Sequence, residues 1–372
     1  MVTAAGSGWG GVLRARHALR LLAGTTVGRL PQCMAPLVLV IAVRAEHGSW
    51  AWASALASAF SGGLAVGHLV LGRVTDRIGQ TLPTIGGALV AAMAYAVLTV
   101  PGCAVAVSGL VLAVVAGVAT PPMEASTRAL WATVVEPRLL RAAYSVDNAA
   151  GESAHIAAPL LVPVCIATGG PRLALGGMAL VGALGAVVVA TCPVSRRWVP
   201  RGPRRGSGLG AMGSAGMPGL ALLLALVGVT VGGVYVGATI AAEESQTPWL
   251  AGVMPAALSV GVIAGCGLYG ARAWPGTVAR HLVVVSGAFA PVWLLLIAAR
   301  TPVAMVAATC AAGMVFGVLH VIGVQAIDLL APPGCVTEAQ AWLVASVGLG
   351  MAGGSALGGV APGPVGVVSL GG

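Results

Sequence analysis

The chain has 372 residues, of which 58% are hydrophobic and only 8% are charged. A soluble domain has about a quarter of its residues charged, so this composition excludes a soluble globule, and its hydrophobicity excludes a disordered chain. Nineteen basic residues against ten acidic ones give a net charge of +9, and all nineteen are arginine. A chain without lysine cannot form a P-loop nucleotide site or a lysine Schiff base. We therefore expect an all-α integral membrane protein.

Eleven segments are long and apolar enough to cross lipid as helices, since about 20 apolar residues span the hydrocarbon core. The predicted spans are 21–43, 50–71, 82–100, 104–127, 142–167, 172–192, 219–241, 250–271, 281–299, 302–327 and 339–360. The residues after Gly359 are too few for another span, because about 12 helical residues rise only about 18 Å. A twelfth helix is thus predicted to be missing or truncated.

Arginine placement predicts the orientation of these spans. With a cytoplasmic N-terminus, alternate loops place fourteen arginines inside and only three outside, namely Arg44, Arg172 and Arg300. Cytoplasmic loops of membrane proteins carry such an excess of basic residues. The polar stretch 193–218 contains five arginines and is predicted to be a cytoplasmic linker. It would divide the chain into a six-helix bundle, 1–192, and a second bundle of five helices with a short tail, 219–372.

One loop motif joins the second and third spans on the predicted inner side. It reads Gly72-Arg73-Val74-Thr75-Asp76-Arg77-Ile78-Gly79. The glycines permit a tight turn, and Asp76 is expected at a helix N-terminus or against an arginine, where it would stabilise one conformation. Two partners stay open: Arg128, or the start of the eleventh span, where 337–340 match a capping box. The alternative is a solvated loop charge.

Ionisable residues at membrane depth are costly, so they face a cavity or pair with one another. The candidates for a proton or substrate site are Arg29, Glu124, Arg128, Asn148, Glu152, His155 and His320. Glu124 and Arg128 stand four apart and are expected to form a structural pair. Glu152 is the preferred proton carrier, and a structural ion pair with Arg29 is the alternative for it. His320 could equally donate to a backbone carbonyl, and Asp147 and Asp328 are expected nearer the interface.

Glycines and cysteines add weaker indications. The pairs Gly228/Gly232, Gly233/Gly237 and Gly261/Gly265, and the series Gly350, Gly354 and Gly358, have the spacing that lets helices pack closely, although 56 glycines produce some pairs by chance. None of the seven cysteines forms a C-x-x-C motif, so inert buried thiols are expected. No metal site, cofactor or nucleic-acid partner is expected. The oligomeric state stays open, with a monomer favoured.

The motif at 72–79 resembles the signature of the loop between helices two and three in the major facilitator superfamily. Gly72, Asp76, Arg77 and Gly79 match that signature, whereas Gln80 and Thr81 replace its final basic pair, a change expected to weaken anchoring at the membrane surface. The segment 267–272 occupies the equivalent loop of the second half and lacks the acid.

The resemblance implies the two-bundle fold of bacterial members of this superfamily. It also implies a secondary transporter that moves a small organic solute across the cytoplasmic membrane by alternating access, with protons as the coupling ion. Export is considered as the direction, although its usual signature in the fifth helix is only echoed by Ala158-Pro159. The alternative is a non-transporting membrane sensor or a degenerate truncated transporter. An enzyme is not expected, because no catalytic motif occurs in the chain.

Overall fold

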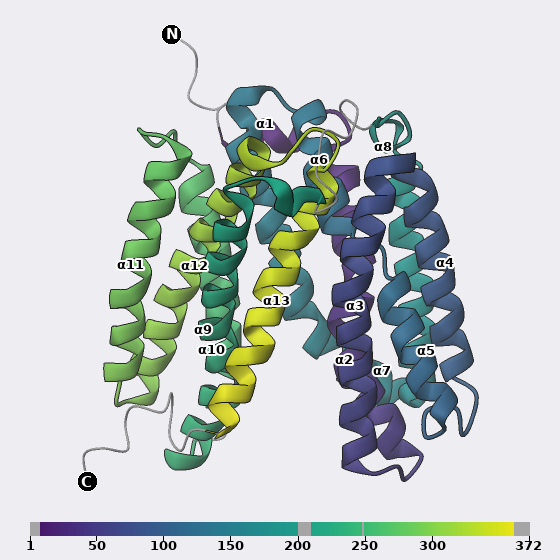
Figure 1. Ribbon diagram of the computed structural model, residues 1–372. Helices are drawn as coiled ribbons and strands as arrows, with labels where there is room; N and C mark the ends of the chain where they lie inside the picture. Colours follow the sequence, from purple (N-terminus) through teal and green to yellow (C-terminus); the bar gives the residue numbers. More distant parts are fainter. Residues whose placement is uncertain (1–7, 200–209, 248, 361–372) are drawn as a thin grey trace.

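A computed structural model describes residues 8–199, 210–247 and 249–360 (Figure 1). The described chain is helical almost throughout. The middle of the predicted linker and the residues after 360, where the twelfth helix was predicted to be missing or truncated, lie outside the described residues.

The first bundle follows the short helix α1 (Trp9–Leu13). Its helices are α2 (Ala18–Ala45), α3 (Trp50–Ile78), α4 (Thr81–Leu98), α5 (Val107–Ala119), α6 (Met123–Val134) and α7 (Leu140–Ala190), with a 3-10 turn, η2 (Pro137–Leu139), before α7. The predicted fifth and sixth spans are joined in α7 across a kink at Gly169 and Gly170. Gly170 has a φ of 70°, in the left-handed region that glycine adopts without strain, so the chain reverses there without a longer loop.

The fourth span differs from the prediction of a continuous helix over 104–127. The structure has two helices instead, α5 and α6, separated at Thr120–Pro122, and the second continues to Val134. Proline lacks an N–H and disfavours helical backbone in the residue before it, so Pro121 and Pro122 interrupt the helix. Thr120 accordingly has extended backbone with ψ of 119°. The break makes Glu124 a first-turn residue of a new helix.

The second bundle follows α8 (Pro193–Arg196) and the 3-10 turn η3 (Gly210–Gly213). It contains α9 (Met217–Glu244), α10 (Leu250–Gly270), α11 (Val278–Ala298), α12 (Pro302–Leu330) and α13 (Val336–Val360). Nine stretches of the described chain are long and apolar enough to cross a membrane. One of them, 137–190, holds the two spans joined at the kink, and α13 is not among the nine. The predicted count of eleven therefore agrees approximately with the structure.

The two bundles stand side by side and converge at one end, beside α1, α6 and α8 (Figure 1). We call this the linker end and the opposite one the distal end. Arg44, Arg172 and Arg300 lie at the distal end, whereas the described arginines of the predicted inner loops lie at the linker end. The described helix ends thus follow the predicted alternation.

Close helix packing confirms part of the glycine prediction. A Cβ added at Gly228 or Gly232 would lie 2.3 or 2.0 Å from a backbone oxygen of α13, and Gly261 and Gly265 stand equally close to α12. These glycines are required because any side chain would push the helices apart. Gly233 and Gly237 behave differently, since an added Cβ meets no described atom within 4 Å.

Candidate functional site

A buried cluster of four charged side chains lies inside the first bundle. The Arg29 Nη2 atom lies 2.9 Å from Glu124 Oε2, and Arg128 forms an ion pair with the other oxygen of Glu124. Arg128 Nε also lies 3.3 Å from Asp147 Oδ2. None of the four side chains is more than 8% exposed. Two positive and two negative charges balance, which is the condition under which charges persist in a dry interior.

Backbone geometry brings these charges together from three helices. The proline break places Glu124 in the first turn of α6 and Arg128 one turn later, so that both project from the same face. Arg29 reaches this pair from α2 by passing over Gly151 of α7, where an added Cβ would lie 2.0 Å from Arg29 Nη1. Gly151 therefore leaves the space in which the guanidinium group lies.

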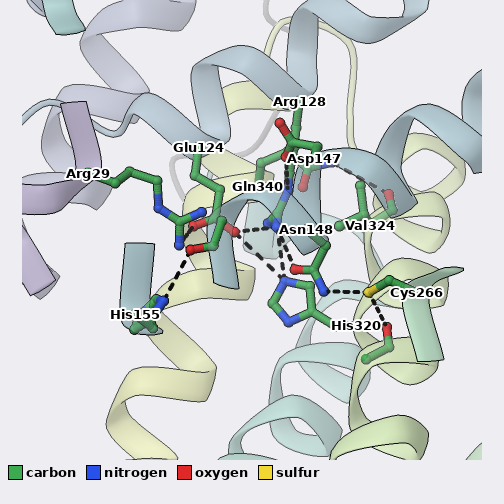
Figure 2. Close-up of polar contacts among 12 residues, drawn as sticks. Arg29, Glu124, Arg128, Asp147, Asn148, His155, Cys266, His320, Val324 and Gln340 are labelled. Atoms are coloured by element: carbon green, nitrogen blue, oxygen red, sulfur yellow. Dashed lines mark hydrogen bonds and ion pairs between the residues drawn. The ribbon is translucent and has the colours of Figure 1, made fainter. Parts of the chain in front are cut away.

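The second bundle supplies uncharged partners to this cluster (Figure 2). Arg128 Nη2 lies 3.4 Å from Asn148 Oδ1 and 3.1 Å from His320 Nε2 of α12. Asn148 Nδ2 in turn lies 3.1 Å from Cys266 Sγ of α10. His320 thus contacts Arg128, and no hydrogen bond from its ring to a backbone carbonyl occurs among the described residues. Polar contacts therefore cross from one bundle to the other at the cluster.

Glu152 and His155 lie on α7 just beyond the cluster. Glu152 is half-buried and His155 is exposed. The His155 Nδ1 atom lies 3.4 Å from the Gly151 carbonyl, and the ring also interacts with Cys33 of α2. Within the described part of the chain, Glu152 forms no hydrogen bond or ion pair, and Arg29 pairs with Glu124 instead. The alternative of a structural Arg29–Glu152 ion pair is therefore wrong.

Glu152 nevertheless has charged and polar neighbours at longer range. It interacts electrostatically with Arg29, with His155 and with Tyr235 of α9 in the second bundle. Twelve residues separate Glu152 from the start of α7, or about 18 Å of helix, which is close to the middle of a hydrocarbon core of about 30 Å. If the start of α7 marks the membrane surface, the carboxylate lies near the middle of the hydrocarbon core, beside Tyr235 of the second bundle.

The loop motif contacts the start of α13 in the other bundle. Asp76 accepts hydrogen bonds from the backbone N–H groups of Thr337 at 3.1 Å and Glu338 at 2.8 Å. Arg73 Nε donates to Glu338 Oε1 at 2.8 Å. Of the two partners left open by the sequence, the structure pairs Asp76 with the helix N-terminus, where a carboxylate is stabilised by the helix dipole. Asp76 is buried, so it is not a solvated loop charge.

The other motif residues shape this contact. A Cβ on Gly72 would lie 3.3 Å from the Glu338 Cα atom, and Gly79 ends α3 with a φ of 91°. Arg77 is exposed. Gln80 donates to the Ser126 carbonyl at 2.9 Å and accepts from Ser195 at 3.2 Å. Gln80 is buried, so this position holds α4 against α6 and α8. The weaker surface anchoring expected from the missing basic pair stays a prediction.

Sequence reasoning missed two important residues. Asp147 was expected near the interface, but it is buried against Arg128. A charge count could have found it, because two buried arginines need a second carboxylate besides Glu124. Glu338 was noted only as part of a capping pattern, and its pairing with Arg73 has no signal in local spacing. Asp328 lies at an exposed position and accepts a hydrogen bond from Tyr144 of the other bundle.

Over the residues that the structure describes, no group of three or more His, Cys, Asp or Glu side chains could hold a metal ion. All seven cysteines are free thiols.

Comparison with known families agrees with this architecture. The model of the Major Facilitator Superfamily matches residues 32–355, which is most of the chain. The chain belongs to the Major Facilitator Superfamily. It is therefore a multi-pass membrane protein of a transporter family and not an enzyme. No curated protein matches its sequence.

Solved structures of other superfamily transporters share the fold of this member. The human organic anion transporter MFSD10 (TETRAN) is 16% identical with a TM-score of 0.67, covering 91% of this chain and 92% of that one. A bacterial homologue of the iron transporter ferroportin, in an outward-facing state, is 13% identical with a TM-score of 0.70, covering 93% and 92%. The proton:xylose symporter XylE is 12% identical with a TM-score of 0.63, covering 91% and 87%. At these identities the likeness establishes the fold alone.

Proposed function

We propose that this superfamily member is a secondary active transporter of a small organic solute in a bacterial cytoplasmic membrane, and that protons drive it. The linker end and the N-terminus face the cytoplasm in this proposal, because the arginines gather there. The two halves, 1–192 and 219–372, rock against each other about the linker 193–218. Protein neighbours that carry organic anions, iron or xylose have the same fold, so the fold leaves the solute class open.

The observation that carries the proposal is the position of Glu152 beside a charge-balanced cluster. Arg29, Arg128, Glu124 and Asp147 neutralise one another, and Glu152 adds a fifth ionisable group that forms no hydrogen bond or ion pair with a described residue. A carboxylate at mid-membrane depth is costly unless it binds a proton or a cation. In our proposal Glu152 is protonated in one step of the cycle and ionised in another, and its charge biases the position of the second bundle.

Contacts at the linker end support the alternating-access part of the proposal. Asp76 and Arg73 bind the start of α13, Tyr144 binds Asp328, and Asn148 binds Cys266. All of these bonds join the two bundles within the halves of the helices nearest the linker end. We propose that they form the closed cytoplasmic gate of an outward-facing state, and that they break when the transporter opens inward. Export is the direction to test first.

The experiment begins with a thermal-shift screen of small organic compounds against the purified protein at several pH values. Each compound that raises the melting temperature is then assayed for flux in proteoliposomes with and without a proton gradient. We expect Glu152→Gln to abolish gradient-driven flux while the compound still shifts the melting temperature. Glu136→Gln is the matched control, because Glu136 pairs with Arg138 on the surface and both side chains are about two-thirds exposed.

Two results would contradict the proposal at different levels. Gradient-driven flux that is unchanged in Glu152→Gln would remove Glu152 as the proton site and leave transport intact. If compounds raise the melting temperature but show no flux in proteoliposomes, with or without a proton gradient, the alternative of a non-transporting sensor or a degenerate transporter would be favoured.

A further inference from the structure

A groove of about 270 Å³ opens at the distal end of the second bundle, away from the charged cluster. Its walls come from the last turns of α9, from α11 and from the segment that leads into α12, and Met254 of α10 contributes to it. Among its lining residues are Gly233, Gly237, Ala241, Glu244, Arg300 and Met305. Neither Glu152 nor any member of the charged cluster lines this groove.

The depth of the groove corresponds to one leaflet of a bilayer. Along α9 it extends from Glu244, the last residue of the helix, to Gly233. Those eleven residues rise about 16 Å, which is half of a hydrocarbon core of about 30 Å. The groove therefore begins at the distal membrane surface and ends near the midplane, the depth reached by the acyl chain of one lipid.

The inner part of the groove is apolar and partly enclosed, since Gly233 is half-buried and Gly237 is buried. Gly233 and Gly237 line it, and a Cβ added at either glycine would meet no described atom within 4 Å. Behind them Ala241 and Met254 belong to a small hydrophobic cluster against which Leu296 and Met305 pack. The glycines thus leave a trough beside α9 that no described side chain fills.

The rim of the groove has one charge of each sign. Glu244 ends α9, and Arg300 precedes α12, and both side chains are exposed. Neither forms an ion pair or a side-chain hydrogen bond with any residue in 8–199, 210–247 or 249–360. Glu244 and Arg300 lie at the depth of lipid headgroups, so a ligand whose tail enters the trough would place its polar group between them.

We propose that this groove binds one phospholipid of the distal leaflet whose headgroup carries both a phosphate and a primary ammonium, as in phosphatidylethanolamine. Arg300 binds the phosphate and Glu244 binds the ammonium, both through charge-assisted hydrogen bonds. One acyl chain lies along Gly233 and Gly237. An anionic lipid without an ammonium would leave Glu244 facing a phosphate, and a membrane-spanning helix needs about twice the length of this groove.

The test measures lipid adducts by native mass spectrometry on the detergent-purified full chain, after delipidation and titration with phosphatidylethanolamine or phosphatidylglycerol. We expect the wild type to bind phosphatidylethanolamine at least tenfold more tightly than phosphatidylglycerol. Gly237→Leu fills the trough, so it should abolish the phosphatidylethanolamine adduct. Gly62→Leu is the matched control, since Gly62 on α3 is exposed and also has no described atom within 4 Å of an added Cβ.

The rim variants separate the two headgroup contacts. Glu244→Gln should lose the discrimination between the two lipids, and Arg300→Gln should weaken both of them. Equal binding of the two lipids to the wild type, or an undiminished adduct in Gly237→Leu, would overturn the proposal. The proposal would also be overturned if a co-purifying protein or a second copy of the chain, rather than a lipid, occupied the groove.

Discussion

The two bundles contribute unequally to the buried polar site. Arg29, Glu124, Arg128 and Asp147 all belong to the first bundle, whereas the second bundle offers the neutral side chains of Cys266 and His320. Charges that balance within one bundle stay paired when the other bundle moves. Contacts between an arginine and a neutral imidazole, or between an amide and a thiol, cost less to break. The difference suggests a rigid charged first bundle and a second bundle that moves against it.

The first long helices of the two bundles, α2 and α9, also differ in what some of their glycines face. In the first bundle the second half of α7 packs on α2, where a Cβ at Gly24 would lie 2.8 Å from Val188 and one at Gly28 3.5 Å from Gly185. In the second bundle Gly233 and Gly237 of α9 line an open groove instead. Gly24 and Gly28 of α2 therefore permit helix contact, whereas Gly233 and Gly237 of α9 leave a trough.

The largest loss of stability is expected from a substitution that breaks the charge balance of the first bundle. Glu124→Gln leaves Arg29 without its carboxylate partner and Arg128 with only Asp147. Removing one member of a buried ion pair costs about 3 to 5 kcal/mol, because an uncompensated charge remains. We expect a correspondingly lower melting temperature in detergent. Glu136→Gln, on the surface, should change stability by less than about 1 kcal/mol, and equal losses in both variants would contradict the buried network.

The next largest effect is expected from a comparison of two glycines on α9, Gly232 on the face packed against α13 and Gly233 on the face that lines the groove. Gly232→Ala adds a methyl group 2.0 Å from the Met351 carbonyl oxygen, so α9 and α13 must separate. Overpacking of this kind costs about 1 to 3 kcal/mol. Gly233→Ala meets no described atom within 4 Å and should be neutral or stabilising by up to about 1 kcal/mol, since alanine favours helix. Thermal unfolding of the two variants side by side checks the difference, and a similar loss in both would contradict the packing described for α9.

A smaller effect concerns the contact between the bundles at the linker end. Asp76→Asn removes the negative charge that faces the N-terminus of α13, which is worth about 1 kcal/mol or roughly a fivefold shift in a conformational equilibrium. Cys266 is buried between the bundles and is a native reporter, because opening of the linker end should expose it. In a background with the other six cysteines replaced, maleimide should label Cys266 about fivefold faster in Asp76→Asn by the same estimate.

Arg77→Gln is the control for the labelling experiment, since Arg77 belongs to the same motif and is exposed. It should leave the labelling rate of Cys266 unchanged. If Asp76→Asn and Arg77→Gln accelerate labelling equally, the hydrogen bonds from Asp76 to α13 do not hold the linker end closed.

The smallest effect is expected from the loss of a single hydrogen bond between the bundles, the one from Tyr144 to Asp328. Tyr144→Phe removes the hydrogen bond to Asp328, an acceptor at an exposed position, and should destabilise the closed arrangement by about 1 kcal/mol. The same labelling of Cys266 measures it, with an expected acceleration no larger than that of Asp76→Asn. Unchanged or slower labelling in Tyr144→Phe would show that this bond does not hold the bundles together in the closed state.

Much of this site could be predicted from residue type and spacing. Glu124 and Arg128 stand four apart, so their pairing follows from helix geometry, and the sequence of the motif indicated that Asp76 would face a helix N-terminus or an arginine. Spacing could not show that Arg29 selects Glu124 over Glu152. That choice depends on Gly151, whose missing side chain leaves room for the guanidinium group beside α7.

The sequence by itself determined that this chain crosses a membrane many times, because its charges are too few to cover a soluble surface and its apolar runs match the thickness of lipid. It also determined the alternation of arginines and the positions of the ionisable residues along the apolar spans. Only the tertiary structure decided which of these residues are partners, that Asp147 is buried and that α9 has one packed and one open face. Periodicity fixes the face on which a residue lies, but the neighbour of that face depends on how distant helices pack.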